Sequence, residues 1–323
     1  MTSHPHDALF RAVFSEPENA SGELQAVLPP SLAARFDWST LRHEPGSFVD
    51  EAFVGRHTDL LFSVSLRHNR AERAFAYVLM EHQSEPDRFM VLRVLGYQVR
   101  IWEQFLKDHP DAKRLPAILP IVVHHGERGW HEAVRFSEIL AIEPDDYAEL
   151  SEFVPSFRFM LDDLIQVSDE ELRDRATATA YARLALFFLK QTRRGDALVQ
   201  GLHVFSALLR ELWRTPRGEA ALATLLRYYV TVKEGTTEPL RQAVVAAIGP
   251  KVEGVLMTIA ENWVAQGLLK GKAETLLEVL EARGLRVTSE QRARILACTD
   301  PTQLSRWAKT VVTATSADAL FAP

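Results

Sequence analysis

Apolar and polar residues alternate along segment 58–66, and this alternation predicts a β-strand. Segment 74–83 is rich in Phe, Tyr, Val and Leu and predicts a second strand. The polar residues 67–73 between them predict a turn, so the two strands are expected to form an antiparallel hairpin. Residues 87–107 follow with apolar side chains at helical spacing, and 117–124 form a nearly continuous apolar run. Such a run after a helix is typical of a strand buried on both faces. Segment 58–126 therefore predicts a mixed sheet with one helical crossover.

The rest of the chain is mostly helical in pattern. Residues 6–28 predict an amphipathic helix with a break near Pro17, and residues 29–57 predict irregular structure. Helical periodicity dominates after about residue 165, in segments 169–193, 196–214, 218–234, 238–248, 251–283 and 289–313. We therefore predict an α/β (α+β) fold: residues 1–165 form a mixed sheet flanked by helices, and 166–323 form a helical region. Residues 127–165 are expected to act as a linker or a lid.

The hairpin has a register that can be estimated from its turn. With a turn centred near residue 70, opposed residues have numbers that add up to about 140, which pairs Asp59 with Glu81. Directly opposed residues have Cβ atoms roughly 4.5–5.5 Å apart. A slip of one residue would move one carboxylate to the other face of the sheet. Gln83 lies two residues after Glu81 and shares its face in any register.

Two carboxylates this close repel each other unless a cation accepts an oxygen from each. Mg²⁺ suits such a pair, because it takes one or two carboxylates and keeps its other positions for water and phosphate. A bound cation lowers the pKa of a coordinated water and stabilises charge on a phosphate. Acidic residues at strand ends are often merely solvated, but Glu81 ends a strongly apolar strand, where an unpartnered charge is unusual. The pattern alone leaves the metal-binding and the solvated interpretation equally open.

The composition of the chain limits the classes of ligand, metal site and location that we expect. The chain has 323 residues, 47% of them hydrophobic, and a net charge of −6, so binding to nucleic acid would need a local basic surface or a bridging metal ion. A single cysteine, Cys298, excludes an intramolecular disulfide and a cysteine-based zinc cluster. The N-terminal residues do not have the pattern of a signal peptide, and no apolar run is long enough to cross a membrane. We expect a cytoplasmic protein without a membrane partner.

The run Met80-Glu81-His82-Gln83-Ser84 after an apolar strand, with Asp59 on the preceding strand, resembles the Rpn family of recombination-promoting, transposase-like nucleases. The Glu-His-Gln-Ser run is a specific motif of that resemblance, and the similarity extends over nearly the whole chain. Further matching segments are His6-Asp7 with Phe10, Leu28-Pro29, residues 48–51, Arg93 with Tyr97, His125-Gly126 with Trp130, residues 263–271, 280–284 and 297–300, and Arg306-Trp307.

The family is similar to a branch of the PD-(D/E)XK nucleases, and this implies roles for the motif residues. Asp59 and Glu81 are then the two acids that bind Mg²⁺, or Mn²⁺ or Ca²⁺, and the backbone carbonyl of His82 completes the metal site. Gln83 stands where most of these nucleases have lysine, and glutamine carries no positive charge. Its amide can still orient a water molecule or a phosphate oxygen, so the electrostatic role passes to the metal or to a residue such as Arg93.

Four further residues are candidates for the site. Asp7, on the first helix, stands where similar nucleases place an additional acid, although a helix-capping or solvated aspartate is an equal alternative. Arg93, Tyr97 and Arg100 are spaced to share a polar helix face with Gln104, which either contacts phosphate or is simply solvated. The adjacent histidines His124 and His125 point to opposite faces of a strand, so we expect a polar role near the site rather than metal ligation.

The function that these features predict is metal-dependent endonuclease activity on DNA. By resemblance, it serves recombination, DNA mobility or phage defence. The alternative is a catalytically weak or inactive nuclease fold that binds DNA or protein through its helical half, and a purely helical interaction protein is a third possibility. Gly267 and Gly271 lie four residues apart on one helix and favour close helix packing, so we expect a homo-oligomer that forms through the helical region.

Overall fold

A computed structural model describes residues 5–44, 60–67, 75–83, 85–233 and 237–321, and for 75–83, 144–145 and 262–266 it describes the backbone alone. The chain divides into two compact units, Met1–Pro250 and Lys251–Pro323. Each unit has its own hydrophobic core. None of the helices in the described part of the chain is both long and apolar enough to cross a membrane.

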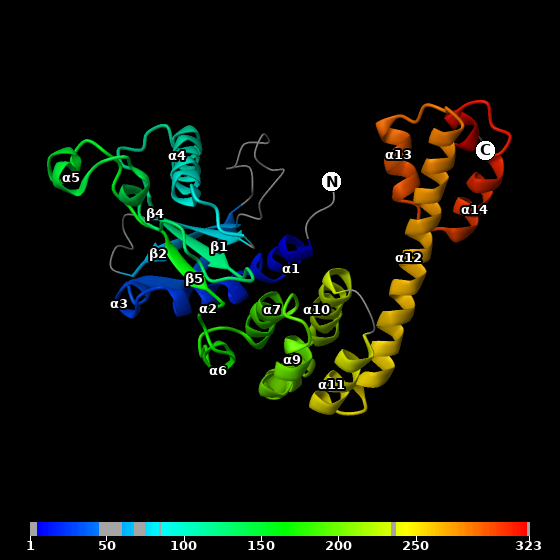
Figure 1. The fold of residues 1–323 in the computed structure, drawn as a ribbon, viewed down its shortest axis with the longest axis horizontal. Coiled ribbons are helices and arrows are strands. Elements are labelled where there is room, and N and C mark those ends of the chain that lie inside the picture. The colour runs from blue at the N-terminus through cyan, green and yellow to red at the C-terminus, as the bar shows by residue number, and fades with distance from the viewer. Residues whose placement is uncertain (1–4, 45–59, 68–74, 84, 234–236, 322–323) are drawn as a thin grey trace. The chain divides into compact units, whose positions relative to one another are not determined.

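The first unit is built on a five-stranded sheet in the order β1-β2-β3-β4-β5 (Figure 1). β2 pairs antiparallel with both β1 and β3, whereas β4 pairs parallel with both β3 and β5. The mixed sheet flanked by helices that the sequence predicts is therefore confirmed. The strands are β1 (Phe36–Glu44), β2 (Leu60–Leu66), β3 (Phe75–Gln83), β4 (Ala117–His124) and β5 (Met160–Asp163).

The two edge strands were not predicted. β1 lies within segment 29–57, which was expected to be irregular, and its register with β2 shifts between Asp37 and Arg42. That irregularity hides the period of two, since the buried residues Phe36 and Leu41 are five positions apart. β5 lies within the expected linker 127–165, where it is only four residues long and carries two aspartates. The prediction of irregular structure was therefore wrong for β1, and the prediction of a linker or a lid was wrong for β5.

The crossover helix α4 (Met90–Asp108) covers one face of the sheet. Its residues Met90, Val91 and Val94 pack with Val122 of β4, and Ile101 packs with Leu61 of β2. α1 (Pro5–Phe14) and α2 (Pro17–Val27) lie on the other face, as Figure 1 shows, with the predicted break at Pro17. Pro17 suits the start of α2, because the first N–H of a helix has no partner within the helix.

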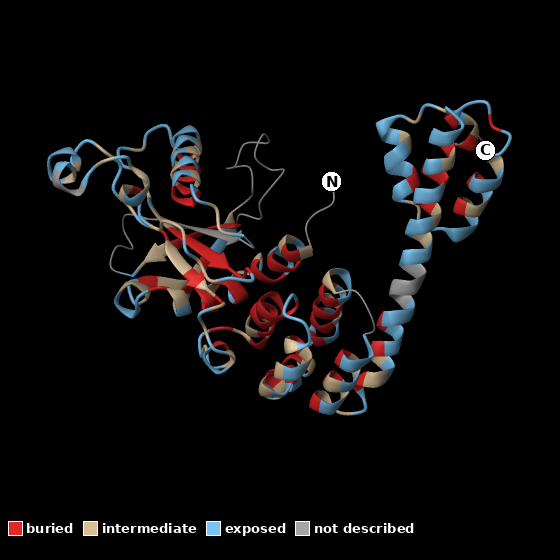
Figure 2. Cartoon of the chain, in the orientation of Figure 1, coloured by how far each residue is buried: buried red, intermediate tan, exposed pale blue. Residues whose placement is uncertain are grey.

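The helices after β5 belong to the same unit as the sheet. α7 (Ala180–Gln191) contacts both α1 and α2, and α10 (Gly218–Val232) contacts α1. Figure 2 shows buried residues along the sheet and along α1, α7 and α10. The sequence pattern becomes mainly helical near residue 165, and this point lies inside the first unit. The compact units divide after Pro250. The other helices of this unit are α3 (Pro30–Ala33), α5 (Pro144–Leu150), α6 (Asp169–Arg173), α8 (Ala197–Gly201), α9 (Ser206–Trp213) and α11 (Glu238–Ile248).

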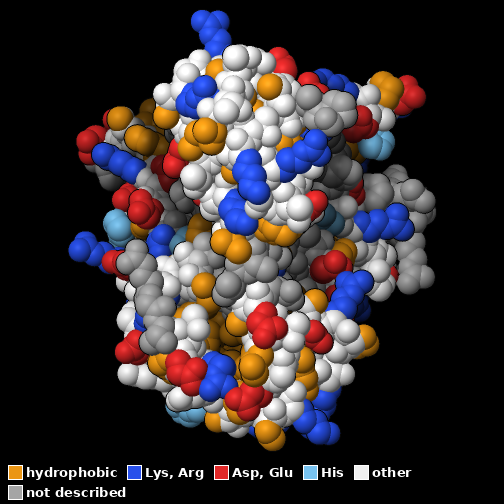
Figure 3. All heavy atoms as spheres, turned by 90° about the vertical axis from the view of Figure 1, so that its right-hand side faces the viewer, with side chains coloured by type: hydrophobic (Ala, Val, Ile, Leu, Met, Phe, Trp, Pro, Cys, Tyr) orange, Lys and Arg blue, Asp and Glu red, His pale blue; other side chains and the backbone are white. Residues whose placement is uncertain are grey.

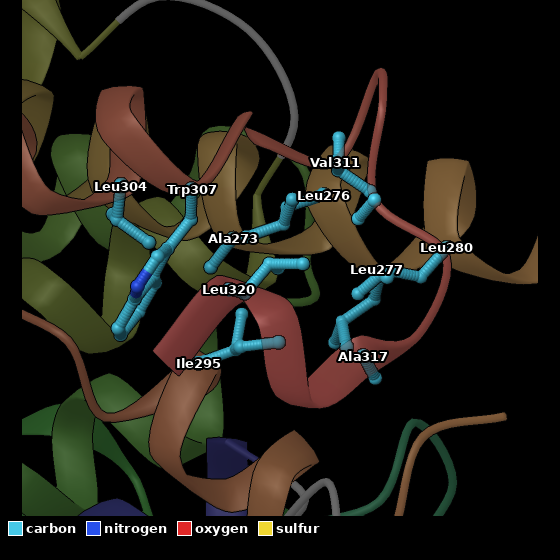
Figure 4. Packing of buried hydrophobic residues seen from close by; sticks show 11 residues of the cluster. Ala273, Leu276, Leu277, Leu280, Ile295, Leu304, Trp307, Val311, Ala317 and Leu320 are labelled. Carbon is cyan, nitrogen blue, oxygen red and sulfur yellow. The ribbon is translucent and has the colours of Figure 1, made fainter. Parts of the chain in front are cut away.

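The second unit contains α12 (Val252–Ala282), α13 (Ser289–Leu296) and α14 (Pro301–Thr310). Its core gathers Leu276 and Leu280 of α12, Ile295 of α13 and Leu304 and Trp307 of α14 (Figure 4). The cap residues explain why α13 and α14 begin where they do. Thr288 accepts a hydrogen bond from the backbone N–H of Gln291, and Asp300 accepts one from that of Thr302.

Candidate active site at the end of the central strands

The hairpin of β2 and β3 has the register that the sequence predicts. Leu60 pairs with Met80 and Ser65 pairs with Phe75, so the numbers of paired residues add up to 140. One more step in the same register would bring position 59 opposite position 81. Asp59 lies outside the described residues, and only the backbone is described at Glu81, so the opposition of the two carboxylates stays a prediction.

The parallel strands align a row of polar residues at their carboxyl ends. The backbone of Gln83 pairs with His124 of β4, and His124 pairs with Asp163 of β5. Residues in register on neighbouring parallel strands belong to the same face, as do residues two apart on one strand. Positions 81 and 83 therefore share the face of Val122 and His124, which is the face that α4 covers.

His124 is fixed by hydrogen bonds on both ring nitrogens. Its Nδ1 lies 3.0 Å from Oδ1 of Asp163, and its Nε2 accepts a hydrogen bond from the backbone N–H of Gly126 at 3.3 Å. A ring that accepts at Nε2 donates its Nδ1–H to the Asp163 carboxylate. The His124 side chain is fully buried, so the carboxyl end of β4 is a rigid part of the candidate site.

Asp163 also organises the loop after β4. Its Oδ2 accepts a hydrogen bond from the backbone N–H of Trp130 at 2.8 Å, and the Trp130 ring packs edge-on against His124. The neighbouring His125 points elsewhere, since its Nδ1 lies 3.2 Å from the carbonyl oxygen of Leu189 on α7. The two histidines thus have partners on different elements, as the alternation along a strand predicts.

On α4, the candidate phosphate-contacting residues form a partly buried network. Arg93 donates to Oδ2 of Asp87 at 2.9 Å and to the Tyr97 hydroxyl at 3.1 Å. Burial lowers the pKa of Arg93, but the hydrogen bonds with Asp87 and Tyr97 outweigh it, so the pKa rises above its ordinary value. Tyr97 is buried and Arg100 is half-buried, so this helix face is not simply solvated. A phosphate group at Arg93 would compete with Asp87.

The first helix is anchored near the proposed additional acid. His6 of α1 is buried, and its Nδ1 lies 2.7 Å from the hydroxyl of Tyr228 on α10. Burial raises the pKa of Tyr228 well above its ordinary range, so the phenol keeps its proton. Asp7 is the next residue after His6 and is half-buried in the first turn of α1. Its role as an additional acid stays a prediction.

A buried ionic cluster on the sheet face opposite to α4 was not predicted from the sequence. Arg175 donates to Oε1 of Glu23 at 2.5 Å and to both carboxylate oxygens of Asp162 at 2.8 and 2.7 Å. Burial and the adjacent Asp162 raise the pKa of Glu23 well above its ordinary value. The three residues come from distant parts of the chain, so no local pattern signals the cluster. It ties α2 to β5 and leaves the polar row on the α4 face separate.

The described residues, the ionic cluster and the polar row included, offer no assembled metal centre. No group of three or more His, Cys, Asp or Glu side chains among them is arranged to hold a metal ion. Asp59 and the side chains of Glu81 and Gln83 are not among the side chains described. The predicted metal site therefore remains a prediction of sequence and register.

Comparison with known proteins extends the similarity over most of the chain. A model of the family described as "Putative transposase, YhgA-like" matches residues 4–219. The chain is 35% identical over 127 residues to the recombination-promoting nuclease RpnD of Escherichia coli O157:H7, covering 39% of this chain and 47% of that protein. It is 36% identical over 123 residues to the recombination-promoting nuclease RpnC of Escherichia coli K12, covering 38% of this chain and 39% of that protein.

A third relative matches over a longer range. The chain is 28% identical over 305 residues to the inactive recombination-promoting nuclease-like protein RpnE of Escherichia coli K12, covering 93% of this chain and 96% of that protein. The matched segments of RpnD and RpnC span less than half of either relative's length. No solved structure matches the chain.

Proposed function

Because the chain belongs to the YhgA-like transposase family, whose relatives include recombination-promoting nucleases, we propose that it is a metal-dependent DNA endonuclease. In this proposal the protein hydrolyses phosphodiester bonds, with the site at the carboxyl end of β3. The resemblance adds a cellular setting of recombination, DNA mobility or defence against phage.

The observation that carries the proposal is the register of the central hairpin. Leu60 lies opposite Met80. If the same register continues by one residue, position 59 is opposite position 81, as two acids that share a metal ion require. A register shifted by one residue would have assigned the two acids to different faces. The parallel pairing of Gln83 with His124 supports the same site, because it brings the end of β3 beside a fixed polar group.

The donor set suits a hard divalent cation. Asp59 and Glu81 offer carboxylates and His82 offers a backbone carbonyl, and oxygen donors of this kind are the ligands of Mg²⁺ and, at longer distances, of Ca²⁺. Mn²⁺ accepts the same donors. These residues would hold the ion, and when bound it would supply charge to the phosphate and acidify a coordinated water.

The surrounding residues would position the substrate. Gln83 would orient a water molecule or a phosphate oxygen through its amide. The rigid pair of His124 and Asp163 would keep the neighbouring strand end in place, because both nitrogens of the ring are already bonded. Arg93 would exchange its hydrogen bond with Asp87 for one with a phosphate oxygen, which suits the planar, permanently charged guanidinium.

The test uses purified wild type with plasmid and linear DNA, in Mg²⁺, Mn²⁺, Ca²⁺ or EDTA. We expect cutting with a divalent cation, none with EDTA, and at least a hundredfold slower cutting by Asp59→Ala and Glu81→Ala. The matched control is Glu103→Ala, an exposed acid on α4, which should cut like wild type. The assignment fails if both variants cut at the wild-type rate, or if wild type cuts with none of the cations.

A second candidate function is a nuclease fold that binds without cutting. It is favoured by RpnE, a relative named inactive that matches 93% of this chain. Glutamine at position 83 in place of lysine is consistent with this alternative, whereas the presence of Asp59 and Glu81 opposes it. DNA binding in EDTA without cutting in any cation would favour the binding module.

Homo-oligomer formation through the helical region also stays a proposal. A Cβ added at Gly267 or Gly271 would have no neighbour within 4 Å among the described residues. The close helix packing that the two glycines favour is therefore not made within the described chain. A second copy is the partner that the proposal requires, and light scattering of the purified protein would measure its mass.

A further inference from the structure

One segment of the C-terminal unit concentrates positive charge although the whole protein is acidic. The chain carries a net charge of −6, yet the segment 283–309 contains six basic residues and only two acids. Figure 3 shows Lys and Arg side chains gathered on the upper part of the visible face. The basic residues are Arg283, Arg286, Arg292, Arg294, Arg306 and Lys309, and the acids are Glu290 and Asp300.

Part of this charge surrounds a hollow between α13 and α14. The hollow has a volume of about 410 Å³, and Arg294, Gln303 and Arg306 supply polar groups to its lining. Trp307 and Phe321 contribute aromatic walls. Guanidinium groups that line a hollow can bind the phosphate groups of a nucleic acid without contacting its bases.

The hollow is held in shape by the core of the unit. Arg294 lies over the Phe321 ring at 4.6 Å from its centre, and that ring packs edge-on against Trp307 at 5.2 Å. Trp307 is buried in the cluster that Figure 4 shows. A guanidinium held over an aromatic ring loses less conformational freedom when it binds a ligand.

Most of these cations have no acidic partner. Within the described part of the chain, no carboxylate forms an ion pair with Arg286, Arg292, Arg294, Arg306 or Lys309, and all five are exposed. Arg283 differs, because it donates to the backbone carbonyls of Val311 and Ala314 and so serves the fold. Exposed basic residues without internal partners are available to an external anion.

We propose that the hollow and its flanking cations bind the phosphodiester backbone of duplex DNA. Arginine matches phosphate with two parallel hydrogen bonds, and such contacts hold a protein on DNA without reading its sequence. An anionic membrane is less suitable, because the large apolar side chains exposed near these cations, Leu296 at the end of α13 and Val312 after α14, do not form an apolar helix face. The inference rests on the proposed function in taking DNA as the ligand.

The experiment measures fluorescence anisotropy of a labelled 25-base-pair duplex in EDTA, with full-length protein and KCl from 50 to 200 mM. The variant is Arg294→Gln/Arg306→Gln. The loss of two phosphate contacts should reduce the salt slope by about 2, so over this fourfold range the variant should lose about tenfold less affinity than wild type. Its affinity at 50 mM should be at least tenfold weaker than that of wild type.

The matched control is Arg214→Gln/Arg217→Gln, which removes the same charge from exposed positions in the first unit. It should retain the wild-type affinity within about twofold. A second variant, Arg294→Lys/Arg306→Lys, keeps the charge and should recover most of the affinity, which separates binding from a folding defect. The inference is overturned if the Gln pair binds like wild type, if both Gln pairs weaken binding equally, or if only anionic lipid vesicles bind.

Binding and cutting can fail separately. Glu103→Ala, which lies outside the C-terminal unit and outside the acids of the candidate site, should bind the duplex in EDTA like wild type. If Glu81→Ala cuts DNA normally while the Arg294/Arg306 variant loses binding, the proposed function fails and this inference survives. If Glu81→Ala loses cutting while the Arg294/Arg306 variant binds normally, the reverse holds.

Discussion

The buried cluster of Glu23, Asp162 and Arg175 predicts a pH dependence of stability that one substitution should remove. Glu23 is fully buried, and two carboxyl groups share a single guanidinium, so the folded protein binds a proton at Glu23 that the unfolded chain releases. The pKa of Glu23 is raised in the folded state. Its stabilising contribution is therefore complete below the unfolded pKa, near 4.5, and is lost as the pH rises towards the folded pKa.

The size of the effect follows from one proton. Between the unfolded and folded pKa values, the free energy of unfolding should fall by about 1.4 kcal/mol for each unit of pH. Glu23→Gln keeps the shape of the side chain and its acceptor for Arg175 but has no proton to lose. The wild type should therefore lose stability relative to Glu23→Gln as the pH rises above 4.5.

The assay is urea unfolding of both proteins at half-unit steps from pH 4.5 to 7. Hydrogen exchange of peptides from α2 and β5 assigns the transition to the first unit. Arg175→Met serves as the opposite perturbation: it leaves the carboxyl groups without their cation and should destabilise the protein by about 3–5 kcal/mol. A wild-type minus Glu23→Gln difference that does not change with pH would refute the reasoning.

Two further pairs of substitutions test the packing and the polar row. Gly22→Ala should destabilise the protein by more than about 1–3 kcal/mol in urea unfolding, because its Cβ would lie 2.3 Å from the Thr177 carbonyl oxygen. Gly96→Ala, with no atom within 4 Å, should instead stabilise α4 by about 1 kcal/mol. Asp163→Ala should cost about 1–3 kcal/mol, since it leaves buried His124 without its acceptor, whereas exposed His131→Ala should change stability by less than about 0.5 kcal/mol.

The central elements were predictable because their signals are local. The largely apolar stretches 60–64 of β2 and 121–123 of β4 reflect strands that are buried on both faces. The strands that escaped prediction, β1 and β5, are the two edges of the sheet. Edge strands are often short, irregular or charged, which limits pairing with other chains, and so their patterns are weak.

In the candidate site, too, some features have local signals in the sequence and others do not. The register of β2 with β3 follows from a turn whose length can be read from the sequence, and the face shared by positions 81 and 83 follows from the period of a strand. The contact between His124 and Asp163 could not be predicted, because it requires the alignment of two parallel strands across 39 residues of chain. Such alignment depends on how helices and loops pack, which no single-sequence pattern encodes.

The division into units shows why the sequence pattern and the packing of the chain give different domain boundaries. Residues such as Phe10, Phe14 and Leu24 on α1 and α2 are fully buried, and α2 contacts the sheet at β1 and β5. α7 contacts both helices, and Gly22 approaches the backbone of residues 177–178 so closely that no side chain fits. A cut at residue 165 would separate α1 and α2 from α7, which they contact. A domain boundary lies where few contacts cross, and this condition is met after Pro250. The change of sequence pattern near residue 165 marks only a change of secondary structure.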